Sequence, residues 1–199
     1  MWSRGAAIRP VPAYAVVDPF ALEQVELELA VDGTIARDEL DRAFERFEAT
    51  QPFLANEMSR VFSQPLDETA LALGYFLTIS IWLAFERAMG PRLGIVSSDA
   101  VRATLDSMAL EEELRASDAR EPIDIDDVVA IEQPAILKFI NQHIELALDV
   151  TQATAPEGDE YEVDVDDVHL IYRAVLVLVM ALSHAVGPVE GSSSCEILA

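Results

Sequence analysis

Two long apolar segments, residues 67–91 and 164–188, constrain the fold of this chain more than any other feature. Each begins with an aspartate that can cap a helix and ends at a Gly-Pro pair, which is a typical helix stop. The uncharged part of the first segment, 70–85, is shorter than the roughly 20 residues that a helix needs to cross a bilayer. The second segment carries a histidine, an arginine and a second histidine, which would be costly in lipid. We therefore expect both segments to be buried core helices.

Helix starts recur along the chain with one internal pattern. An apolar residue precedes a capping Asp or Ser, and another apolar residue follows four positions after the cap, as in a hydrophobic staple. The pattern predicts helices that begin after five capping residues: Asp18, Asp67, Ser97, Asp124 and Asp164. Asp127 and Asp167 then occupy the position of the capping-box acid in the last two helices. Helices alone should account for the ordered part of the chain.

An internal repeat is the second organising feature. Gln51-Pro52 recurs as Gln133-Pro134, and segment 67–91 aligns without a gap with segment 164–188. The second alignment pairs Tyr75 with Tyr172 and one Gly-Pro stop with the other. A proline at these positions should divide or kink the helix that contains it. Each copy is thus expected to be a helical hairpin.

These patterns predict an all-α bundle of about six helices, in which two pseudo-repeated hairpins form a four-helix core and two further helices flank it. The expected organisation is an extended N-terminal arm (1–17), a single helical domain (18–190) and a flexible C-terminal tail (191–199). Within the domain the pseudo-repeats cover about 38–91 and 123–188, and a helical connector, 97–116, joins them.

The charge balance limits the classes of partner. The 199 residues include 36 acidic and 13 basic side chains, so the formal net charge is −23. Such a surface repels nucleic acid backbones and anionic membranes and favours a basic protein partner. A single cysteine, Cys195, excludes an internal disulfide, and the first residues do not resemble a signal peptide, so a cytoplasmic location is expected.

One polar stripe on the last apolar segment is a candidate ligand site. At 100° per residue, His169, Arg173, Met180 and His184 fall within a sector of about 60° on one helix face, and Tyr172 adjoins it. As a cleft between the hairpins, the stripe would offer a histidine for acid-base chemistry and an arginine for anion binding. The alternative is that the stripe is the solvent-facing side of a core helix.

No motif predicts a metal, a cofactor or a catalytic nucleophile. The single Asp-x-x-His, Asp166 to His169, lacks the second motif that di-iron bundles need. The acidic stretch 157–167 lacks the glycine and glutamate positions of a calcium loop, and no phosphate-binding glycine motif occurs. Enzyme activity is therefore not expected, although a polar cleft at the stripe would favour it.

Apolar residues near both termini are candidates for contact with a partner. Trp2 and Tyr14 lie in the expected arm, and Ile197 and Leu198 lie beyond a Gly-Ser linker in the tail. Taken together, the sequence predicts a non-enzymatic, acidic helical module that binds a protein partner of basic character. The alternatives are an enzyme or sensor with a cleft at His169, Arg173 and His184, an acidic mimic of nucleic acid, and a homodimer that uses the apolar helices as its seam.

Overall fold

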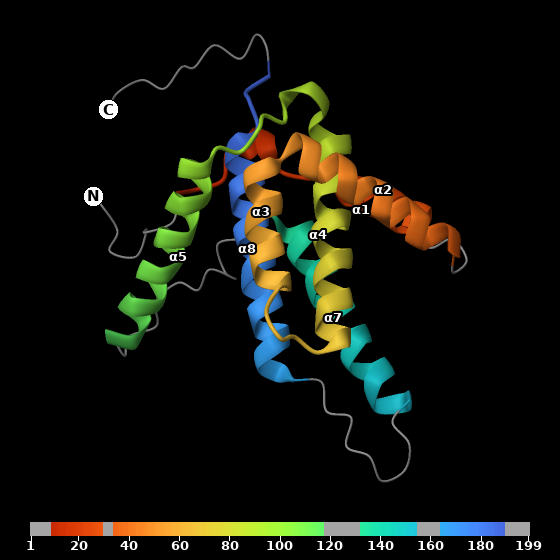
Figure 1. Cartoon of the computed structure of the whole chain (residues 1–199). Coiled ribbons are helices and arrows are strands. Elements are labelled where there is room, and N and C mark those ends of the chain that lie inside the picture. The colour runs from red at the N-terminus through yellow and green to blue at the C-terminus, as the bar shows by residue number, and fades with distance from the viewer. Residues whose placement is uncertain (1–8, 30–33, 118–131, 155–163, 190–199) are drawn as a thin grey trace.

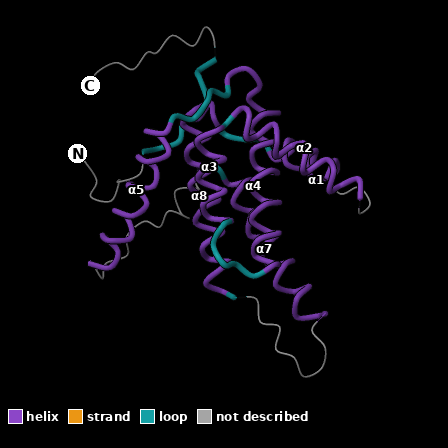
Figure 2. Tube along the Cα trace, in the orientation of Figure 1, coloured by secondary structure: helices purple, strands orange, loops and turns teal. Residues whose placement is uncertain are grey.

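The computed structural model describes residues 9–29, 34–117, 132–154 and 164–189. Within these ranges the chain is all-α: seven α-helices pack together and no strand is present (Figures 1 and 2). The predicted all-α class is therefore confirmed. The helices are α1 (Pro19–Leu29), α2 (Thr34–Thr50), α3 (Pro52–Phe62), α4 (Glu68–Met89), α5 (Ser98–Ser117), α7 (Pro134–Thr154) and α8 (Val165–Ala185).

Helices α4 and α8 form the centre of the bundle and pack against each other (Figure 1). Both are long and apolar enough to cross a membrane by length and composition alone. In the protein, however, 67% of the most apolar stretch of α4 and 61% of that of α8 are buried. The largest buried side chains, including Trp82 and Phe85 on α4 and Leu178 on α8, belong to this interior. Both apolar segments are thus core helices, as expected.

Four of the five predicted caps lie in the described residues, and each one accepts a hydrogen bond at a helix start. The Asp67 side chain accepts from the N–H of Ala70 at 2.8 Å, and Asp164 accepts from the N–H of Asp166 at 2.9 Å. Asp18 accepts from the Phe20 N–H at 2.8 Å, and Ser97 accepts from the Ala100 N–H at 3.2 Å. These bonds satisfy N–H groups that have no partner within the helix. Asp124 and Asp127 lie outside the described residues.

The first Gln-Pro pair divides a helix, as predicted, and the second stands at the start of one. Helix α2 ends at Thr50 and α3 begins at Pro52, while α7 begins at Pro134. Proline is tolerated at a first helical position because its missing N–H has no partner there. Gln51 stands between α2 and α3, and Gln133 directly precedes α7. Both glutamines are buried, with 3% of Gln51 and none of Gln133 exposed.

Each of these buried glutamines holds an extended stretch of backbone from elsewhere in the chain. Gln51 donates from Nε2 to the Gly94 carbonyl at 2.9 Å, and its Oε1 accepts from the Val96 N–H at 2.9 Å. Gln133 donates to the Ala15 carbonyl at 2.8 Å and accepts from the Val17 N–H at 3.0 Å. One side-chain amide thus satisfies a backbone carbonyl and a backbone N–H, as a neighbouring strand would. We call Gln51 and Gln133 the clamp glutamines.

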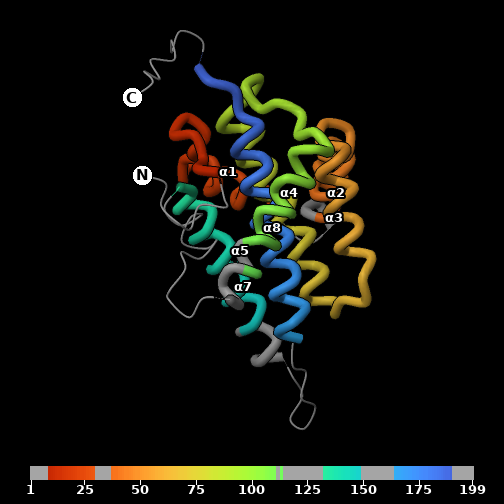
Figure 3. Tube along the Cα trace, turned by 90° about the vertical axis from the view of Figure 1, so that its left-hand side faces the viewer, coloured from red at the N-terminus to blue at the C-terminus, as the bar shows by residue number. Residues whose placement is uncertain are grey.

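The flanking helices α1 and α5 each follow one of the clamped stretches. Helix α1 packs on α4 and α7, whereas α5 packs on α8 and α3. Helix α5, which coincides with the expected connector, lies at the edge of the bundle beside α8 (Figures 1 and 3). The segments that follow α4 and α8 meet at a single antiparallel bridge between Leu93 and Val186.

Part of the expected N-terminal arm packs into the protein. Residues Ala13–Ala15 form a 3-10 turn, and Val11, Ala15 and Val17 are buried. The clamp on Ala15 and Val17 fixes this stretch against the core, while the expected bounds of the N-terminal arm stay a prediction. Trp2 and the tail residues Cys195, Ile197 and Leu198 lie outside the described residues.

Candidate functional site

The polar stripe of α8 does not converge on one cleft. His169 is exposed, Tyr172 and Arg173 are half-buried, and Met180 is buried. Residues 169 and 184 stand at opposite ends of the helix, about 22 Å apart along its axis at 1.5 Å per residue. A shared helix face therefore does not make a shared site. Of the three basic residues in the stripe, only His184 lines one of the cavities described below.

The remaining candidates are Tyr14, a metal site and the acidic stretch. Tyr14 is 41% exposed, and its carbonyl accepts from Nη1 of Arg92 at 3.3 Å, so its ring remains accessible while its backbone is held. Among the described residues, no group of three or more His, Cys, Asp or Glu is placed to hold a metal ion. Residues 157–163 of the acidic stretch lie outside the described part of the chain.

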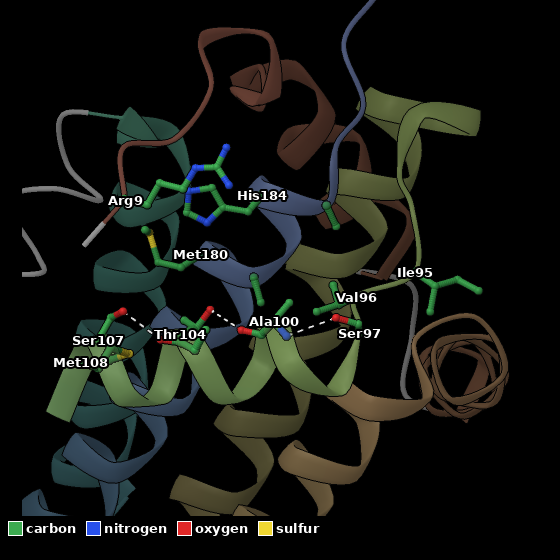
Figure 4. A pocket seen from close by; sticks show the side chains of 13 residues that line it. Arg9, Ile95, Val96, Ser97, Ala100, Thr104, Ser107, Met108, Met180 and His184 are labelled. Atoms are coloured by element: carbon green, nitrogen blue, oxygen red, sulfur yellow. Dashed lines mark hydrogen bonds between the residues drawn. The ribbon is translucent and has the colours of Figure 1, made fainter. Parts of the chain in front are cut away.

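A cavity of about 370 Å³ lies between α5 and α8, and we call it the α5–α8 pocket (Figure 4). Small side chains on both helices open it, among them Ala100, Ala103 and Ala181. The hydroxyls of Thr104 and Ser107 donate to carbonyls of their own helix, at 3.0 and 2.8 Å. Because these hydroxyls are occupied by the helix, the wall that α5 presents is largely apolar.

One end of the α5–α8 pocket is positively charged. Nε2 of His184 lies 3.2 Å from the Pro10 carbonyl, a contact that ties the N-terminal segment to the end of α8. Arg9 precedes this proline, and its side chain lies beside His184 at the pocket wall (Figure 4). No acidic side chain is among the described residues that line the pocket.

A second cavity, about 780 Å³, lies between α2, α3 and α4, and we call it the α2–α3–α4 groove. Its floor is aromatic. Phe44 of α2 stacks on Tyr75 of α4 with ring centroids 4.7 Å apart, and Phe62 of α3 lies 6.4 Å from Tyr75. Leu71 of α4 also lines the groove and is 38% exposed. The groove therefore offers apolar surface to solvent.

Carboxylates surround the aromatic floor. Asp41 and Glu68 line the groove, together with one basic residue, Arg37. Partial burial raises the pKa of Tyr75 to about 12, and the negative charges of Asp41, Glu48 and Glu45 add to the shift because they oppose a phenolate. The pKa of Tyr75 thus reports a negative field over the groove.

A third cavity, about 670 Å³, lies between α1, α2 and α4, and each of its two cations is paired with a carboxylate. Arg46 pairs with Glu86 at 2.9 Å, and Arg87 pairs with Glu28. Both cations already have carboxylate partners, so this cavity presents little unpaired charge to a ligand.

Comparison with protein-family models, with curated proteins and with solved structures finds no match to this chain. The aromatic groove was missed by the sequence analysis, because its floor is assembled from three helices and periodicity describes one helix at a time. The available signal was the pair of aromatic residues Phe44 and Phe62 on either side of the Gln-Pro break.

Proposed function

We propose that the protein is a helical interaction module that binds a basic, amphipathic helix of a partner protein in the α2–α3–α4 groove. The observation that carries the proposal is an aromatic floor bordered by carboxylates: Phe44, Tyr75 and Phe62 below, Asp41 and Glu68 beside them. Amphipathic helices dock by placing an apolar face in such a groove, while their charged face meets the rim. Basic residues complement this rim.

The charge of the whole chain supports the same partner. A net charge of −23 attracts a basic segment over several ångströms and accelerates its encounter with the groove. The same charge disfavours nucleic acid and anionic membranes, so we propose neither as a partner. Binding of this kind requires no catalytic residue and no cofactor, and a cytoplasmic location agrees with the single cysteine in the sequence.

A synthetic peptide tests the groove. The probe is a fluorescent helix of about 18 residues, or five turns, with Leu at helical spacing on one face and Lys elsewhere. Leu71→Lys should weaken binding by roughly tenfold, because it places a like charge on the apolar floor. The matched control is Leu110→Lys, which alters a leucine of α5 that is 47% exposed. Fluorescence anisotropy measures both affinities.

A second pair of variants separates the groove from the general acidity of the chain. Asp41→Asn removes a rim carboxylate, whereas Asp106→Asn removes an exposed carboxylate of α5. Both variants change the net charge equally, so only binding in the groove distinguishes them. Equal losses for the two variants, or a peptide that binds both leucine variants alike, would contradict the proposal. Self-association without peptide binding, seen by sedimentation, would indicate a homodimer seam instead.

We also propose that the two halves of the chain are structural repeats related by a pseudo-twofold axis. The first half runs from the N-terminal segment to the end of α4, and the second runs from Gly94 to the end of α8. Two observations support this organisation. The clamp glutamine of the first half holds Gly94 and Val96 at the start of the second half, while that of the second half holds Ala15 and Val17 at the start of the first. Each half therefore holds the beginning of the other.

The second observation concerns one contact between α4 and α8. A Cβ placed on Gly74 would lie 2.6 Å from Cδ1 of Ile171, so these positions face each other closely. The same two positions are paired when segment 67–91 is aligned with segment 164–188. Equivalent residues meet in this way where a twofold axis passes between them.

A reciprocal exchange tests the repeat. Gly74→Ile alone should lower the free energy of unfolding by about 2 kcal/mol or more, because it overpacks the contact. Combining it with Ile171→Gly places the large and small residues in exchanged positions. If the positions are equivalent, the double variant should recover a good part of the loss beyond the sum of the single effects. Additive losses in urea unfolding would contradict the axis.

A further inference from the structure

We infer that the α5–α8 pocket binds a small amphipathic anion, a carboxylate with an apolar tail. This site is separate from the α2–α3–α4 groove and shares no lining residue with it. The inference depends on three features of the pocket: an apolar wall, a positive end, and the lack of acidic side chains among its described lining residues.

The wall suits a short hydrocarbon tail. Met180 and Ala181 of α8 are buried with 2% exposure, and Met108 of α5 is buried with 4%. Methionine adapts its shape to apolar ligands, and alanine leaves the space open. At about 370 Å³ the pocket lies near the lower end of the range for small-molecule sites. The occupant is therefore a small molecule and not a helix.

The positive end suits a carboxylate. Arg9 forms no ion pair with another residue that the structure describes, and His184 is held through its contact with the Pro10 carbonyl. A guanidinium presents several donors to a carboxylate and remains charged at every pH that the protein meets. In a chain with 13 Lys and Arg residues against 36 acidic ones, a cavity lined by an arginine, a histidine and no described acidic residue is unusual.

The cavity between α1, α2 and α4 is a counterpart of this pocket in which the basic residue is already neutralised by a carboxylate. Arg87 aligns with His184 when the two apolar segments are superposed in sequence. The clamped residue Val17 precedes Glu28 by the same number of residues by which the clamped residue Val96 precedes Ser107.

The two cavities differ in how the corresponding basic residue is neutralised. In the first half Glu28 pairs with Arg87, whereas in the second half Ser107 occupies the position that corresponds to Glu28. In the first half the neutralising carboxylate comes from Glu28 of α1. In the second half, a bound ligand would supply the corresponding carboxylate. This comparison relies on the proposed repeat, but the geometry of the pocket does not.

Three probes of equal carbon number test the inference on the full chain: octanoate, octan-1-ol and octylammonium. Bulk electrostatics favours octylammonium, because the protein carries a net charge of −23. Only a local positive site can reverse that order. Isothermal titration calorimetry should therefore show that octanoate binds most tightly of the three. Equal binding of all three probes, or a preference for octylammonium, would overturn the inference.

Variants test whether octanoate binds in the α5–α8 pocket. Arg9→Gln should weaken octanoate binding at least fivefold and leave octan-1-ol unchanged. Arg102→Gln, at an exposed arginine of α5 that does not line the pocket or the groove, is the matched control and should change neither. Ala103→Phe, at an exposed position of the pocket wall, should reduce binding of both probes by filling the space. Unaltered octanoate affinity in Arg9→Gln would overturn the site. Binding of the Lys-Leu peptide should be the same in Arg9→Gln as in the wild type, so the two proposals can fail separately.

Discussion

At the scale of single residues, the clamp glutamines join distant segments of the chain. Gln51 and Gln133 are buried, and each binds a backbone carbonyl and a buried backbone N–H of an extended stretch. The sequence analysis predicted the helix break at the prolines but not the role of the glutamines. Periodicity and capping rules describe local structure, whereas the partners of these amides are distant in the sequence.

Removing a clamp should therefore destabilise the protein strongly. Gln51→Ala leaves the buried Val96 N–H and the part-buried Gly94 carbonyl without their partner, and an unsatisfied buried group costs about 1–3 kcal/mol. We expect a loss of about 2–4 kcal/mol in the free energy of unfolding, measured by urea titration. Gln64→Ala, at an exposed glutamine, is the control and should change little. Similar stabilities of the two variants would show that the clamp is dispensable.

Tyr75 provides a pH-dependent signal from the groove. Its raised pKa means that the folded protein keeps the phenol proton after the unfolded chain has lost it, so stability should fall as the pH rises from about 10 to about 12. Below pH 10 the residue is neutral in both states and contributes no pH dependence. Tyr75→Phe should flatten this part of the stability profile. A tyrosinate absorbance titration should show the late-titrating group in the wild type and not in the variant.

At the scale of elements, the sequence predicted where helices begin but not how they connect. The capping pattern located the starts of α1, α4, α5 and α8. Asp167, however, was predicted to complete the capping box of its own helix. Instead, its Oδ2 accepts from the backbone N–H of Asp67, the cap of α4, at 2.7 Å. The acid at the third position of α8 thus caps the neighbouring core helix, a contact that only the packing of α4 against α8 creates.

This contact between helices should be measurable. Asp167→Ala removes the acceptor for the Asp67 N–H and a favourable charge at the start of α8, for a combined loss of about 1–2 kcal/mol. Asp166→Ala removes a comparable charge from the same helical turn without that bond, so its loss should be smaller. Asp167→Asn keeps an acceptor oxygen and should restore much of the stability. Thermal unfolding that fails to separate the two alanine variants would contradict the cross-helix cap.

At the scale of the whole molecule, fold class followed from sequence whereas the sites did not. Alternating caps, prolines and apolar segments are enough to predict an all-α bundle with α4 and α8 as its core. The residues of the polar stripe lie on one face of α8, but the rise of the helix places His169 and His184 at opposite ends. The groove and the pocket each combine side chains from several elements, including Phe44 with Tyr75 and Arg9 with His184. Such combinations depend on packing, which helical periodicity does not encode.

The most direct test of the proposed function is hydrogen-exchange mass spectrometry of the intact chain with and without the Lys-Leu peptide. A docked helix should slow amide exchange in residues 37–44 and 59–76, which border the α2–α3–α4 groove. Exchange in α5, residues 98–108, should be unchanged. Protection of α5 instead of the groove, or no protection while the peptide is bound, would contradict the account.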